Sequence, residues 1–130
     1  MKKYIFIFLI LLLNGCYYSF ETGCFYTPQL VTCTDQGEDF PYVAFFQKKE
    51  TIGHTDPVIR WNDIKACGGI NISIKKNTFE IKNERDSKGV INSNVIYAFE
   101  NCMMKKGYVR LYYIDCGTQN PRWNKGKCNL

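Results

Sequence analysis

Histidine is almost absent from this sequence, because His54 is the only one in 130 residues. The seven cysteines include no C-x-x-C pair. Structural zinc sites need closely spaced Cys and His ligands, so the sequence predicts no metal centre. A Ser-His or Cys-His catalytic pair would have to use His54, which lies in the turn-like stretch 53–56 with no catalytic motif around it.

Motifs for phosphate and dinucleotide chemistry are missing as well. The chain has no glycine-rich phosphate loop, no Walker lysine and no dinucleotide fingerprint. Its neighbouring carboxylates, Glu38 with Asp39 and Glu84 with Asp86, fall in loop-like stretches, where acidic residues are ordinarily exposed. We therefore expect no enzymatic activity and no cofactor.

A hydrophobic run long enough to cross a membrane is also missing. The ten apolar or aromatic residues from Tyr4 to Leu13 would form a helix that covers about half of a roughly 30 Å hydrocarbon core. Lys2 and Lys3 precede this run and the small Gly15 follows it, which is the layout of a secretory signal peptide. We expect residues 1–15 to be that peptide.

The end of this run has a distinctive spelling, Leu13-Asn14-Gly15-Cys16. It resembles the lipobox of bacterial lipoproteins, in which a small residue precedes a cysteine. The resemblance implies cleavage before Cys16, a diacylglycerol on the Cys16 thiol, and a fatty acid such as palmitate on the new amine. Two or three acyl chains hold a protein durably on a bilayer. The alternative is a secreted protein in which Cys16 forms a disulfide.

Charge of one sign is not concentrated in the remaining chain. Without Lys2 and Lys3, 15 Lys and Arg stand against 12 Asp and Glu, a net charge of about +3. The lysine pairs at 48/49, 75/76 and 105/106 are scattered, which is typical of solvated faces. We therefore expect no nucleic-acid partner.

Six cysteines remain once Cys16 is assigned to lipid: Cys24, Cys33, Cys67, Cys102, Cys116 and Cys128. In a small exported protein an even number of cysteines indicates disulfides. Sequence alone allows about 15 pairings. Proximity along the chain favours Cys24 with Cys33, Cys116 with Cys128, and Cys67 with Cys102.

The body of the chain is expected to be one α+β domain over residues 24–130, with a small antiparallel sheet, two short helices and disulfide bridges. Residues 16–23 would form a lipidated tether, or equally the first packed segment of the domain. Strands are predicted at 41–46 and 108–114, and a hairpin at 70–81, where Ile70, Ile72 and Ile74 alternate with polar residues. The tail 118–130 is expected to be irregular.

The first helix is predicted after Asp56, a good N-cap, with Pro57 in the first helical position and Gly68-Gly69 beyond its end. Val58, Trp61 and Ile64 recur at helical spacing, so we expect Trp61 and Ile64 to face the core.

The second helix is predicted from Asn94 onward. Its expected core face consists of four residues at helical spacing, Val95, Phe99, Cys102 and Met103. Lys105 and Lys106 suit its last turn, and Gly107 its C-terminal cap.

Three segments carry a further resemblance: residues 61–68 (WNDIKACG), residues 102–108 (CMMKKGY) and residues 115–117 (DCG). They resemble small disulfide-containing outer-membrane lipoproteins of Gram-negative bacteria, and the Cys-Met-x-x-Lys-Gly-Tyr segment is the most distinctive part. The resemblance covers about half of the mature chain and implies a location rather than a mechanism. Because Tyr17, and not aspartate, follows Cys16, it implies the outer membrane.

These features predict a lipid-anchored envelope protein with a non-enzymatic interaction or structural role and an envelope protein as partner. The alternative is a disulfide-rich inhibitor or ligand binder that acts on a soluble hydrolase, for instance through residues 118–127. An enzyme that uses His54 is the third interpretation, after these two. The 20 aromatic residues exceed what such a body usually buries. We therefore expect an exposed contact patch that includes Tyr112, Tyr113 and Trp123.

Overall fold

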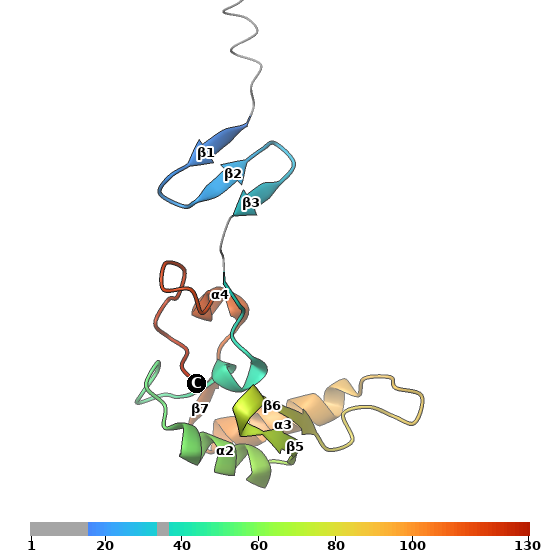
Figure 1. The fold of residues 1–130 in the computed structure, drawn as a ribbon. Helices are drawn as coiled ribbons and strands as arrows, with labels where there is room; N and C mark the ends of the chain where they lie inside the picture. Colours follow the sequence, from blue (N-terminus) through green and yellow to red (C-terminus); the bar gives the residue numbers. More distant parts are fainter. Residues whose placement is uncertain (1–15, 34–36) are drawn as a thin grey trace, which may run out of the picture. The chain divides into compact units, whose positions relative to one another are not determined.

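The computed structural model in Figure 1 describes residues 16–33 and 37–130. The predicted signal peptide, residues 1–15, lies outside the described residues. Contacts divide the chain at residues 36/37 into two compact units, so the predicted domain 24–130 contains parts of both. Among the described residues, no helix is long and apolar enough to span a bilayer.

The first unit is a three-stranded antiparallel sheet in the order β1-β2-β3. Its strands are β1 (Tyr17–Ser19), β2 (Cys24–Tyr26) and β3 (Val31–Cys33). Cys24 and Cys33 are directly opposite each other in the ladder and form a disulfide. Residues 17–19 thus belong to a paired sheet.

The second unit combines helices with two separate strand pairs (Figure 1). Its helices are α2 (Pro57–Ala66), α3 (Ser93–Lys105) and the short α4 (Tyr113–Cys116). β4 (Phe46–Lys48) pairs with β7 (Tyr108–Arg110), and β5 (Gly69–Ser73) pairs with β6 (Thr78–Ile81), both antiparallel. A 3₁₀ turn at Tyr42–Phe45 precedes β4, and a second one at Ile74–Lys76 connects β5 to β6. The predicted α+β class with disulfides and small antiparallel sheets is confirmed.

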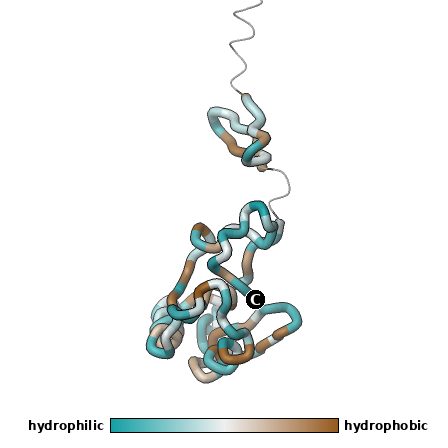
Figure 2. Tube along the Cα trace, turned by 90° about the vertical axis from the view of Figure 1, so that its left-hand side faces the viewer, coloured by the Kyte–Doolittle hydropathy of each residue, from teal (hydrophilic) through white to brown (hydrophobic). Residues whose placement is uncertain are grey.

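The main core lies where α2, α3, the hairpin β5–β6 and β4–β7 meet. Its buried residues are Val43, Phe46, Trp61, Ile64, Ile81, Phe99, Met103 and Tyr108. A second cluster contains Phe40, Ala44, Cys116 and Cys128. Figure 2 shows hydrophobic stretches alternating with hydrophilic ones along this unit, so both clusters are assembled from short segments.

Two disulfides brace the second unit. Cys67–Cys102 joins the end of α2 to α3 with a Cα–Cα distance of 5.7 Å. Cys116–Cys128 closes the irregular tail with a Cα–Cα distance of 5.3 Å. Together with Cys24–Cys33, these are the pairings that proximity along the chain predicts.

Two predicted strands differ from the structure. Residues 42–45 form a 3₁₀ turn, which buries the neighbours Val43 and Ala44 in different core clusters, and the strand begins at Phe46. The strand from Tyr108 ends at Arg110. The backbone N–H of Tyr112 donates to Asp115 Oδ2 at 2.9 Å, and this cap starts the helical turn α4.

Both predicted longer helices are present, and the residues expected on their core faces are buried or half-buried. Trp61 and Ile64 of α2 and Phe99 and Met103 of α3 are buried. Val58 is exposed, because residues three apart drift by about 60° per step, which places it about 120° around the helix from Ile64.

Candidate functional site: an apolar groove between α2 and β5

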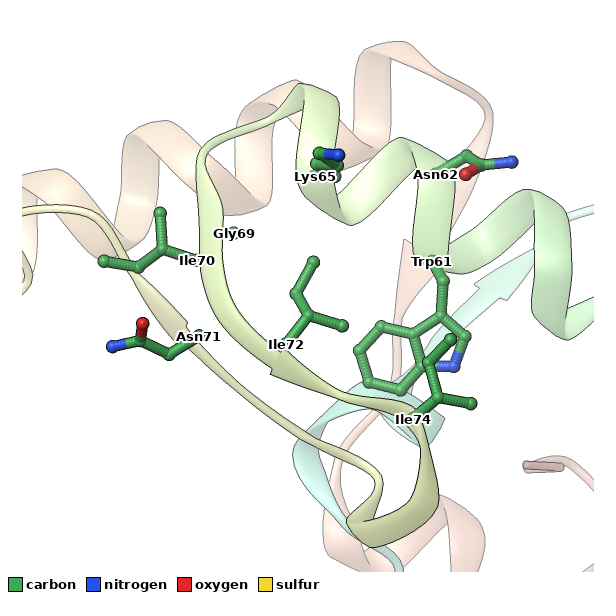
Figure 3. A pocket seen from close by; sticks show the side chains of 8 residues that line it. All are labelled: Trp61, Asn62, Lys65, Gly69, Ile70, Asn71, Ile72 and Ile74. Carbon is green, nitrogen blue, oxygen red and sulfur yellow. The ribbon is translucent and has the colours of Figure 1, made fainter.

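A groove of about 470 Å³ runs between α2 and β5. Figure 3 shows Trp61, Asn62 and Lys65 on the helix side, and the residues of β5 and the following turn on the other. Those residues are Gly69, Ile70, Asn71, Ile72 and Ile74. The Trp61 indole and Ile74 lie close together at one end, and Ile70 and Asn71 lie at the other.

Helix α2 presents its side of the groove because its start is well determined. Asp56 Oδ1 accepts hydrogen bonds from the backbone N–H groups of Val58 at 2.8 Å and Ile59 at 3.1 Å. This cap and Pro57 set the helical register. In that register Trp61 is only 7% exposed and packs edge-on against Phe79. Trp61 is thus a core anchor that also forms part of the groove wall.

Strand β5 can lie this close to the helix because residue 69 is glycine. A Cβ there would come within 2.5 Å of Ile64 Cγ2 and 2.9 Å of the Ile64 carbonyl oxygen. After Gly69 the strand is irregular: Asn71 has a φ of 49°, and the pairing with β6 shifts register between Ile70 and Ser73. Ile70 is exposed because neighbours along a strand point to opposite sides and Gly69 faces Ile64. Ile74 leaves the strand for an exposed turn.

The groove is chemically simple. Its lining is mostly apolar, with Asn62, Asn71 and the cation of Lys65 as polar groups, and Asn71 Nδ2 already donates to Glu80 Oε2 at 2.6 Å. An adjoining hollow of about 350 Å³ shares Trp61, Asn62 and Ile74. Lys65 is the one ionisable side chain among the lining residues, and the largely apolar surface suits binding of an apolar group.

A charged cluster lies on another side of α2. Tyr108 donates its hydroxyl proton to Asp63 Oδ2 at 2.9 Å, and Lys106 Nζ lies 3.1 Å from Asp63 Oδ1. Lys48 Nζ is 3.5 Å from Asp63 Oδ2. Burial opposes ionisation of Asp63, but the hydrogen bonds from Lys106 and Tyr108 and the charges of Lys106 and Lys48 outweigh it and lower its pKa. Burial and the bond to Asp63 raise the pKa of Tyr108.

A second charged cluster, centred on Glu100, connects α3 to the β4–β7 pair. Glu100 Oε1 accepts hydrogen bonds from the Tyr42 hydroxyl at 2.9 Å and from Arg110 Nε at 3.0 Å. The Arg110 guanidinium lies 4.9 Å from the ring centroids of both Tyr42 and Tyr112. Burial raises the pKa of Tyr42, and its hydrogen bond to Glu100 raises it further.

A third polar group joins the half-buried Asn129 to the buried Thr55 and Arg60 at the foot of α2. The Asn129 side chain accepts from Thr55 N at 3.0 Å and donates to Thr55 O at 2.8 Å. The Asn129 carbonyl accepts from Arg60 Nη1 at 2.9 Å. Arg60 is fully buried, desolvation lowers its pKa, and its Nε has no hydrogen-bond partner among the described residues. These contacts hold the tail against the helix.

The structure places the predicted cysteines in two groups. Six form the three disulfides, and Cys16 is exposed and free at the start of the first unit. This leaves one thiol accessible to chemistry.

Two of the three residues predicted for an aromatic contact patch are exposed. Tyr112 and Tyr113 are exposed and have the exposed Ile114 as neighbour. Trp123 is half-buried, and its ring is contacted by Arg122 at 5.3 Å, whereas that of Tyr112 is contacted by Arg110. A common contact surface of Tyr112, Tyr113 and Trp123 stays a prediction.

His54 is exposed in a turn, where its backbone N–H donates to Thr51 O at 2.9 Å. Within residues 16–33 and 37–130, no three His, Cys, Asp or Glu side chains gather as metal ligands would.

Sequence reasoning missed the groove and the buried Arg60. Arg60 lies four residues before Ile64 and seven before Cys67, a spacing that places it on their face of the helix. The groove had no such signature, because it depends on the irregular strand at Asn71. Comparisons of the chain with protein-family models, curated proteins and solved structures find no match, so the function is inferred from its own residues.

Proposed function

We propose that this chain is a lipid-anchored protein of the bacterial outer membrane, with a non-enzymatic interaction or structural role. One observation carries the proposal: of seven cysteines, only Cys16, the lipobox residue, is unpaired and exposed. Its position directly before the first folded unit is where a lipid would tether the protein without disturbing either core.

The interaction role is supported by the groove between α2 and β5. Exposed apolar side chains continue along both of its walls, with Val58 on α2 and Ile70 and Ile74 on the hairpin. Contiguous apolar surface on a small protein is typical of an interaction site. The disulfide Cys67–Cys102 braces the helix that forms one wall, so the groove needs little reorganisation on binding.

The anchor is tested by metabolic labelling with a fatty-acid analogue and mass spectrometry of the membrane-bound protein. We expect lipid on Cys16, and we expect the Cys16→Ser chain to lose the label and leave the membrane fraction. A Tyr17→Asp chain is the matched control: it should keep the lipid and, by the rule that favours aspartate in the inner membrane, change membranes. A free Cys16 thiol in the mature wild-type protein would refute the anchor.

The groove is tested by placing a photo-crosslinking amino acid at Ile70 or Ile74 in the full chain in intact cells. We expect one envelope protein to be captured from these positions and not from Val90, an exposed apolar residue on the loop between β6 and α3 that does not line the groove. Equal capture from Val90 would mean that the groove is not the contact surface.

The alternative, an inhibitor of a soluble hydrolase, is favoured by one feature. The disulfide Cys116–Cys128 closes an exposed loop that contains Arg122, Lys125 and Lys127. A braced loop of this kind loses little entropy on binding. Capture of a hydrolase by a crosslinker at Lys127, with none from Ile70, would favour this function.

A further inference from the structure

The three-stranded sheet of the first unit displays apolar rings beside the proposed lipid. We propose that the face formed by Tyr18, Phe20 and Phe25 inserts into the interfacial layer of the bilayer and holds the first unit against the membrane. This inference rests on the proposed function, because it starts from a lipid on Cys16.

The composition of this unit suits a bilayer surface. Residues 16–33 contain five aromatic residues and a single charged one, Glu21, with no Lys or Arg. Phe20 is 87% exposed and Phe25 is 49% exposed. Phenylalanine has no polar atom, so water is an unfavourable environment for rings displayed in this way.

The three rings form one surface. The centroid of Tyr18 lies 5.0 Å from that of Phe20 and 4.6 Å from that of Phe25. Tyr18 and Phe25 are directly opposite each other in the β1–β2 ladder. The ladder and the Cys24–Cys33 disulfide hold this arrangement, so little order has to be gained when the rings enter the lipid.

The alternation of side chains along a strand selects this face. Residues two apart point to the same side of a sheet, so continuing β1 by one residue places Cys16 on the side of Tyr18. A lipid on Cys16 would therefore leave the sheet on the face that carries the three rings. A three-residue strand is about 10 Å long, which matches the depth of about 5–10 Å that amphipathic elements reach in the interface.

The opposite face of the sheet is already packed against itself. Tyr17 and Tyr26 stack with their centroids 4.9 Å apart, and the Tyr26 hydroxyl donates to Thr22 Oγ1 at 3.1 Å. The buried Cys24 lies on this face beside its disulfide partner. The exposed rings of Phe20 and Phe25 belong instead to the face of Tyr18.

The test uses the full mature chain with Cys16→Ser, so that no acyl chain contributes. The vesicles consist of zwitterionic phosphatidylcholine, which has no net charge, so that attraction of lysines to anionic lipid does not contribute. Flotation should show measurable binding, and Phe20→Ser/Phe25→Ser should weaken it by about tenfold or more. The matched control is Val90→Ser/Ile91→Ser in the second unit, where 60% and 53% of the side chains are exposed. This control should bind like the parent, and disulfide mapping and circular dichroism establish that all chains are folded.

The proposal is overturned if the parent chain does not bind these vesicles, if Phe20→Ser/Phe25→Ser binds as well as the parent, or if both double variants weaken binding equally. It is also overturned if vesicles do not increase the protection of the two phenylalanines from solvent. Residues 37–130 would then already cover both rings in the absence of lipid. Mass spectrometry of Cys16 separates this failure from failure of the anchor. If Cys16 carries lipid but the phenylalanine substitutions do not change vesicle binding, only the membrane contact is refuted.

Discussion

The hydroxyl of Tyr108 donates a 2.9 Å hydrogen bond to Oδ2 of Asp63, which joins the start of β7 to the middle of α2. Asp63 also accepts from Lys106 and lies near Lys48, so one carboxylate connects residues from three elements. This relationship positions the helix that forms one wall of the groove.

Asp63→Asn should lower the free energy of unfolding by about 1–2 kcal/mol near neutral pH, because the charged acceptor of Tyr108 is lost while the ion pairs to partly exposed lysines contribute little. The folded-state pKa of Asp63 is lowered, so its contribution is present above the unfolded aspartate pKa of about 4 and is lost as pH falls below it. Urea unfolding at neutral and strongly acidic pH should therefore show a difference that shrinks in acid. A difference independent of pH would contradict this account.

Alkaline titration should show tyrosines that ionise late. The pKa values of Tyr42 and Tyr108 are raised, so their contribution to stability is complete below the unfolded tyrosine pKa of about 10 and is lost as pH rises above it. Ultraviolet absorbance of tyrosinate measures this. Asp63→Asn should bring the Tyr108 step to lower pH and leave that of Tyr42 in place, and movement of both steps would indicate global unfolding instead.

Arg60 and Asn129 should respond oppositely to substitution. Arg60→Met replaces a buried cation, whose Nε has no partner among the described residues, with an apolar chain of similar length, so stability should change by less than about 1 kcal/mol or rise. Asn129→Ala leaves the backbone N–H and carbonyl of Thr55 without their partner and should cost about 2 kcal/mol. Chemical denaturation of both variants gives the comparison. A larger loss for Arg60→Met would show that the charge itself stabilises the tail.

Gly117→Ala should be far more destabilising than Gly107→Ala. Both glycines have positive φ, 71° and 89°, so both variants incur backbone strain, which is greater at Gly117 because its ψ of −145° lies near a region essentially restricted to glycine. Only at Gly117 would the new Cβ meet a backbone atom, the Trp123 carbonyl oxygen, at 1.8 Å, whereas nothing lies within 4 Å at Gly107. Thermal unfolding should separate the two variants clearly. Equal losses of stability would mean that the loop 117–127 can move away from the new Cβ without a loss of folding free energy.

Removing the Cys67–Cys102 disulfide with alanines should lower stability by about 3–4 kcal/mol, because it closes a loop of roughly 35 residues around the main core. Removing Cys24–Cys33 should leave the unfolding of the second unit unchanged, because that bridge lies entirely within the first unit. Tryptophan fluorescence follows the second unit selectively, since Trp61 and Trp123 both belong to it. A shift of this transition without Cys24–Cys33 would show that the two units are coupled.

Local chemistry made the helices predictable. Asp56, Pro57 and the glycines after Cys67 determine where α2 begins and ends, and α3 carries a continuous apolar face. The segments 42–45 and 113–116 were less accessible, because each is a single turn whose conformation depends on which core its neighbours reach. Val43 and Ala44 show this directly, since adjacent residues enter different clusters.

The sequence by itself determined the even number of framework cysteines, the boundaries of two helices and the α+β class, and it predicts a lipobox at Cys16. Each of these features depends on composition or on residues that are neighbours along the chain. The disulfide pairing was predictable too, because two of the pairs are close in the sequence and leave Cys67 for Cys102. Only the tertiary structure decided that Arg60 is buried, that Asp63 meets Tyr108, and that α2 and β5 leave a groove beside Trp61. Those features depend on distances between segments far apart in the sequence, which are set when the apolar faces pack together.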